Sequence, residues 1–187
     1  MKRLLCFALA LVLAFALCAC SGTPKTDYSE YGDSVVIDIG DVTAKAGGTV
    51  DVPISIANNK GAAAIAVELI CDTSMLQAQS AKAVGKLSGA GFFLSNAGDG
   101  GSDDKLAEAG ISSDAIIGDT GGNVKVLWFN TENVTGDGEI MVVTFKVADG
   151  ASGKIDITAK ENADDIVTED QQNISDKVYL AGSVTVG

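Results

Sequence analysis

The residues best suited to covalent chemistry lie near the start of the chain, in the run Leu17, Cys18, Ala19 and Cys20. Upstream, Lys2 and Arg3 precede an almost unbroken apolar run over residues 4–17, which is too short for a typical membrane-spanning helix. A small residue before a cysteine at the expected cleavage position suits lipoprotein processing, in which the thiol receives a diacylglyceryl group. We therefore predict a signal peptide over residues 1–19 and lipidation of Cys20, which would anchor the protein to the membrane at the cell surface, on the extracellular side. The alternative is an ordinary cleaved signal and a secreted protein.

The remainder has the composition of a tether followed by one domain. Residues 20–33 are rich in small, polar and acidic residues, and residues 34–187 are long enough to bury their own core. The formal net charge of −12 argues against nucleic acid as a partner. Of the four cysteines, only Cys71 stays free once the signal is removed and Cys20 is lipidated, so no internal disulfide is expected. We interpret Cys71 as a small core side chain.

Catalytic residue types are scarce. The chain has no histidine, which removes the commonest general base, the Ser-His-Asp arrangement and the usual zinc ligand. Acidic pairs at residues 103–104, 164–165 and 169–170 could in principle serve a glycosidase, but solvated loop charges are their ordinary role in so acidic a chain. None follows the spacing of a calcium loop, and incidental calcium at residues 99–104 or 164–170 is the remaining alternative. We therefore predict no enzyme activity and no metal site.

Alternating apolar residues indicate short strands between glycine-rich turns. The predicted strands cover residues 35–39, 50–56, 62–70, 91–95, 124–129, 140–147, 154–158 and 178–186. Hardly any helical periodicity accompanies them, so we predict an all-β sandwich or jelly roll. Pro53 falls on the polar side of its run and suggests an edge strand. Within residues 96–123, which are long for a loop, Ser102-Asp103-Asp104 could cap a short helix ending at Gly110.

Three segments, in order, resemble signatures of the cohesin family: residues 50–56 (VDVPISI), residues 67–76 (VELICDTSML), and residues 136–140 running into 143–147. Residues 182–187 (GSVTVG) are similar to that family's closing strand. The resemblance implies a nine-stranded β-sandwich with jelly-roll topology whose function is protein binding. Cohesins hold dockerin modules, which carry their own calcium, and so assemble cellulosome-like complexes. The resemblance thus implies a dockerin-containing partner and no cofactor on this chain. We expect the chain to be a monomer.

In cohesins the partner lies on one open sheet face, and the resemblance implies that this face comprises residues 62–70, 91–95, 124–130 and 154–158. If Val67 and Leu69 point inward, the third predicted strand displays Ala64, Ala66, Glu68 and Ile70. On the later strand, inward Leu127 and Phe129 would leave Val126, Trp128 and Asn130 outward. We expect Trp128 to be the apolar anchor. Its alternative place is the core, because alternation is hard to assign in an all-apolar strand.

Many cohesins carry polar residues where this chain has Ala64 and Ala66. Recognition would therefore depend on apolar contact and on residues expected at the rim: Glu68, Asn130, Thr131 and Glu132. Acidic rim residues would select partners that bear Lys or Arg.

Two other functions remain open. A carbohydrate-binding module shares the jelly-roll architecture, but it normally needs several exposed rings, and only 5% of this chain is aromatic. A surface adhesin without a soluble partner is the other alternative, and a hydrolase is a more distant one.

Overall fold

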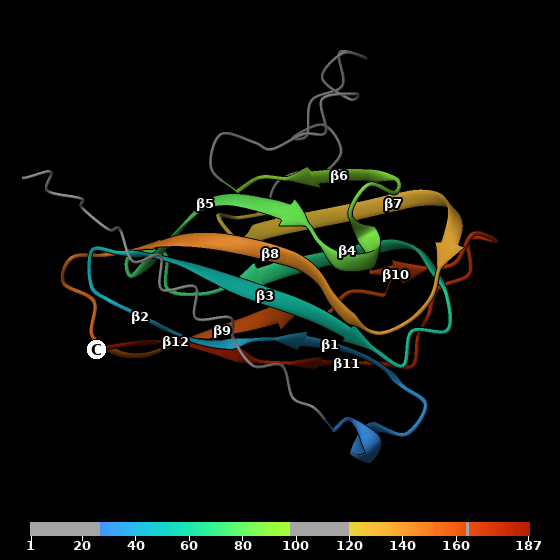
Figure 1. Ribbon diagram of the computed structural model, residues 1–187, viewed down its shortest axis with the longest axis horizontal. Helices are drawn as coiled ribbons and strands as arrows, with labels where there is room; N and C mark the ends of the chain where they lie inside the picture. The colour runs from blue at the N-terminus through green and yellow to red at the C-terminus, as the bar shows by residue number, and fades with distance from the viewer. Residues whose placement is uncertain (1–26, 98–119, 164) are drawn as a thin grey trace, which may run out of the picture.

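Two β-sheets pack face to face in the computed structural model (Figure 1), which describes residues 27–97, 120–163 and 165–187. The only helical segments among these residues are two short 3-10 turns, η1 (Ser29–Tyr31) and η2 (Gly85–Leu87). The all-β sandwich predicted from the sequence is thereby confirmed. The signal peptide, Cys20 and the helix expected after Ser102 lie outside the described residues. No helix in the described part is long and apolar enough to cross a membrane.

One layer is a five-stranded sheet. Its strands, in spatial order, are β11 (Lys177–Leu180), β1 (Val35–Ile39), β3 (Thr49–Ala57), β8 (Gly138–Val147) and β5 (Leu76–Ala83). Strand β5 was not predicted from the sequence, because its Ala, Gln, Ser and Lys residues favour strands weakly and most of them are exposed at the sheet edge.

Pro53 lies in the middle of this sheet, so the expectation of an edge strand was wrong. The pairing of β3 with β1 ends at Ile54 and Ile39, and beyond it Gly40 donates a backbone hydrogen bond to the oxygen of Pro53 at 2.9 Å. Pro53 therefore lacks its N–H on the side of β3 that faces β1, where β1 has already ended. No strand hydrogen bond is lost there.

The other layer is a seven-stranded sheet. Six of its strands, in spatial order, are β2 (Asp41–Ala44), β12 (Gly182–Val186), β9 (Gly153–Lys160), β4 (Ala62–Ile70), β7 (Val124–Val134) and β6 (Phe92–Ser95). The seventh, β10 (Ile166–Val167), pairs with the first half of β4, and β9 pairs with the second half. The short strands β2 and β10 were not predicted from the sequence.

The described residues thus contain twelve strands where nine were expected. One reason is that two stretches of the chain change sheets part-way. One enters as β1 and continues after Gly40 as β2; the other enters as β11 and continues after Ala181 as β12. The two stretches run parallel to each other in both sheets. They cross closely, since a Cβ on Gly182 would lie 2.3 Å from the Ile39 backbone oxygen, so only glycine fits there.

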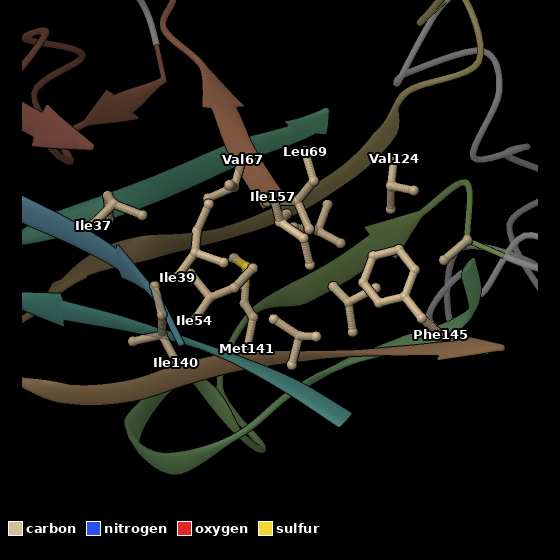
Figure 2. Close-up of a cluster of buried hydrophobic side chains, with 14 of the residues drawn as sticks. Ile37, Ile39, Ile54, Val67, Leu69, Val124, Ile140, Met141, Phe145 and Ile157 are labelled. Atoms are coloured by element: carbon tan, nitrogen blue, oxygen red, sulfur yellow. The ribbon is translucent and has the colours of Figure 1, made fainter. Parts of the chain in front are cut away.

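The core lies between the two layers and is almost wholly aliphatic (Figure 2). Ile54, Met141 and Phe145 reach it from the five-stranded sheet, and Leu69 and Ile157 reach it from the other; all five are buried. Alternation places every second side chain of most strands in this core and the intervening ones on the outer faces. In β8 the consecutive residues Ile140 and Met141 both belong to the core, where the pairing with β3 shifts register.

Residues 28–33, the end of the expected tether, contact the domain. The Tyr28 hydroxyl donates to an Asp38 carboxylate oxygen at 2.8 Å, and Lys60 forms an ion pair with Asp33 at 3.0 Å. The Asn58 amide donates to the backbone oxygen of Gly32 at 3.1 Å. This segment therefore packs against β1 and the loop after β3.

Candidate functional site

Strands β9, β4, β7 and β6 lie side by side, as the resemblance implied. In β4, Ile65, Val67 and Leu69 are buried in the core. The outer side of β4 therefore carries Ala64, Ala66, Glu68 and Ile70, as expected. Ile70, at 40% exposure, is the one exposed large apolar side chain among the described residues.

The orientation expected for β7 was wrong. Val126 and Trp128 are both fully buried at 0% exposure and belong to the core between the layers. Trp128 is paired with Ile65 on β4 and with Phe93 on β6, and both neighbours also face the core. The indole is therefore no surface anchor, and the loss of this ring also weakens the case for sugar stacking.

A second apolar cluster, which was not predicted from the sequence, lies on the outer side of the same strands. Leu94 is fully buried there, packed against the partly buried side chains of Phe92, Leu127 and Phe129. The rings of Phe92 and Phe129 stack with their centroids 5.1 Å apart and their planes 21° from parallel. A sequence signal was available: Lys125 shares its side of β7 with Leu127 and Phe129, and a lysine seldom points into a core.

Small residues lie beside this outer cluster. Ala64 pairs with Phe129 and Ala66 with Leu127 across the β4–β7 register, and both alanines are partly exposed. The large side chains of β6 and β7 thus stand next to a low apolar surface on β4. A partner's apolar side chain could pack against both without displacing polar groups.

A charged row crosses the sheet next to the apolar one. Lys125 lies opposite Glu68 across β4–β7, and Lys160 lies opposite it across β4–β9. Glu68 is only 6% exposed and was expected at the rim, so that expectation was wrong. Its Oε1 accepts hydrogen bonds from the Asn123 amide at 2.8 Å and the Lys160 ammonium at 3.2 Å.

These contacts explain how Glu68 stays ionised. Burial raises the pKa of its carboxyl, but the hydrogen bonds from Asn123 and Lys160 and the charges of Lys160 and Lys125 outweigh it, so the pKa lies below its ordinary value. Two ammonium groups surround one carboxylate, which leaves the row with a net positive charge.

The residues expected at the rim follow at the far end of β7. Thr131 and Glu132 are exposed and Asn130 is partly exposed. The Asn130 amide donates to the Glu132 backbone oxygen at 3.3 Å. Just beyond, Asn133 and Glu169 exchange two hydrogen bonds, which join this end of β7 to the loop after β10.

Asp165 and Cys71, two other residues of reactive type, have contacts that stabilise the fold and do not favour catalysis. Asp165, expected to be a solvated loop charge, is 6% exposed and accepts hydrogen bonds from the Tyr179 hydroxyl at 2.9 Å and the Asn162 N–H at 2.6 Å. Burial and the neighbouring Asp72 raise the pKa of the Cys71 thiol, which disfavours the nucleophilic thiolate. No group of three or more Cys, Asp or Glu side chains in the described residues is placed to hold a metal ion.

Comparisons with known proteins agree with this arrangement. The family model described as Cohesin domain matches residues 35–186. No curated protein matches the chain.

Three solved structures illustrate the structural similarity. A chain of a type I cohesin–dockerin complex from Clostridium thermocellum is 18% identical, with a TM-score of 0.60 over 82% of this chain and 99% of the other. The seventh ScaB type I cohesin from Pseudobacteroides cellulosolvens is 21% identical, with a TM-score of 0.58 over 82% and 92%. A non-cellulosomal cohesin from the archaeon Archaeoglobus fulgidus is 16% identical, with a TM-score of 0.60 over 82% and 91%. At these identities the similarity establishes the fold.

Proposed function

The chain belongs to the cohesin family, and from this membership we propose that it captures dockerin-bearing proteins and so assembles complexes of the cellulosome type. Cohesin domains are non-catalytic binding modules, and we propose the same for this chain. The observation that carries the proposal is the family match over residues 35–186, which spans both sheets.

We place the dockerin on the outer face of β9, β4, β7 and β6. The outer apolar cluster supports this choice, because Phe92, Leu127 and Phe129 remain partly exposed and lie on the same side of the sheet as Ile70. Exposed apolar surface of this kind on a soluble domain commonly marks an interface. Of the residues first expected to contact the partner, Ala64, Ala66, Glu68, Ile70, Asn130, Thr131 and Glu132 remain in the proposal, and Val126 and Trp128 do not.

Capture assays with a panel of recombinant dockerins test the proposed function. The immobilised domain, residues 27–187, is expected to retain at least one dockerin in calcium buffer. A chelator should abolish that binding without changing the thermal stability of this chain alone, because we propose that the calcium is held by the dockerin. Retention of no dockerin, or a chelator-dependent loss of stability in this chain, would contradict the proposal.

We further propose that the full chain is a monomer attached to the cell surface through lipid on Cys20. Radiolabelled palmitate should enter the wild-type chain and not a Cys20→Ala variant, and only the former should sediment with membranes. Equal distribution of the two proteins between membrane and medium would contradict the anchor. Sedimentation velocity of residues 27–187 tests the monomer.

A further inference from the structure

The charged row on the outer face indicates which side chain the partner brings to it. We propose that the captured dockerin places an aspartate or glutamate over Lys125 and Lys160, beside an apolar side chain that packs on Leu127 and Phe129. This inference rests on the proposed function and specifies the chemistry of its partner.

The lysine ammonium groups of the charged row are accessible to a partner, and the Glu68 carboxylate is not. Glu68 is 6% exposed and already accepts hydrogen bonds from Asn123 and Lys160, so an incoming cation would have to displace a lysine to reach it. The Lys160 side chain is 51% exposed, and Lys125 is partly exposed. The surface therefore presents ammonium groups to a partner, while the carboxylate between them is covered.

The register of the sheet places the charged row directly beside the apolar one. Leu127 pairs with Ala66, and Lys125 pairs with Glu68 two residues away on the same side of the strands. Successive side chains on one face of a strand are about 7 Å apart. A carboxylate and an apolar side chain on adjacent turns of a helix, or on one face of a strand, have a similar spacing and can engage both rows at once.

The local charge of the row is opposite in sign to the net charge of the chain. The chain has a net charge of −12, and from that charge alone a cationic contact residue would be expected on the partner. The charged row reverses this expectation locally, because it holds two lysines and one ionised glutamate that is already paired with Lys160. The two interpretations predict opposite effects for the same substitutions.

Titration calorimetry with a dockerin captured by the wild-type domain distinguishes an anionic from a cationic contact residue on the partner. Lys125→Gln and Lys160→Gln are each expected to weaken binding about three- to tenfold, because each removes a favourable charge at the interface. Glu68→Gln is expected to tighten binding about threefold, because it removes the carboxylate that opposes an incoming anion. Lys82→Gln, on β5 of the other sheet, makes the same change of charge as the lysine variants and should leave the dissociation constant unchanged.

The opposite pattern, in which Glu68→Gln weakens binding and the lysine variants do not, overturns this inference but leaves dockerin capture intact. Failure of the wild-type domain to bind any dockerin contradicts the proposed function and this inference with it. Circular dichroism confirms that each variant is folded. As a second readout, one Asp or Glu of the captured dockerin should show coupling to Lys125 in a double-mutant cycle, and coupling from none of them overturns the inference.

Discussion

The indole nitrogen of Trp128 donates a hydrogen bond to the backbone oxygen of Ala90 at 2.7 Å. This contact ties the middle of β7 to the turn that leads into β6. The next residue, Gly91, has a φ of +68°, and a Cβ there would lie 2.2 Å from the backbone oxygen of Phe129. The turn therefore lies directly against β7, and Trp128 positions the edge strand that carries part of the outer apolar cluster.

Trp128→Ala is expected to destabilise the domain by about 3–5 kcal/mol, because it leaves a large cavity between the sheets and an unpaired backbone oxygen. Urea unfolding measures this loss. Trp128 is the only tryptophan, so its blue-shifted fluorescence and its resistance to iodide quenching report burial directly. A red-shifted spectrum of the wild type, together with a Trp128→Ala variant that loses dockerin binding at unchanged stability, would restore Trp128 as a surface anchor.

Leu127→Ala is expected to weaken dockerin binding by about 1–2 kcal/mol, because Leu127 lies at the centre of the proposed contact. Its cost to folding should be smaller than that of Trp128→Ala, since Leu127 is only partly buried. Val142→Ala is the matched control, because Val142 is a partly buried outward residue on β8 in the other sheet. Equal binding by the two variants would place the partner elsewhere.

Gly182→Ala is expected to lower the free energy of unfolding by about 2 kcal/mol or more, because the new methyl group would overlap the backbone oxygens of Ile39 and Gly40. Those atoms belong to the other crossing stretch and cannot rotate away. Gly150→Ala serves as control: its methyl group would meet no atom within 4 Å, so its effect should stay within about 0.5 kcal/mol. Similar losses in both variants would argue against the close crossing.

The carboxyl of Glu68 should make stability depend on pH in the acid range. Its folded-state pKa lies below the ordinary value of 4.5, so its ionisation stabilises the fold above that pH, and the stabilisation is lost as the pH falls through the folded-state pKa. The difference in unfolding free energy between wild type and Glu68→Gln should therefore shrink as the pH is lowered from neutral to acid conditions. Lys160→Gln should shift this loss to higher pH. If this difference in unfolding free energy grew on acidification, the lowered pKa of Glu68 in the folded state would be contradicted.

Much of the fold follows from local patterns in the sequence. Alternation in residues 50–56, and of Met141, Val143, Phe145 and Val147 in the later run, predicts two strands, which became β3 and β8. In β4 the single charged residue, Glu68, fixes which side faces outward, since its neighbours Val67 and Leu69 must then face inward. The family resemblance rests on these same segments.

The orientation of β7 shows where local patterns are insufficient. From Val126 to Phe129 every residue is apolar, so both faces of the strand could enter a core. Tertiary packing selected one of them, because Val126 and Trp128 fit into the core beside β4 and β6, while Leu127 and Phe129 meet Leu94 and Phe92 on the other side. Lys125 was the local signal for this orientation.

Composition and alternation are local properties, and they were enough to establish an all-β chain, most of its strand positions, its acidity and its lack of histidine. Three features came instead from the assembled sandwich: the passage of β1 and β11 from one sheet to the other, the place of Pro53 inside a sheet, and the burial of Glu68 between two lysines. Each of these depends on which distant strand becomes a neighbour. That choice is made by packing between segments far apart in the chain and by the register across strand pairs, neither of which a single strand's pattern contains.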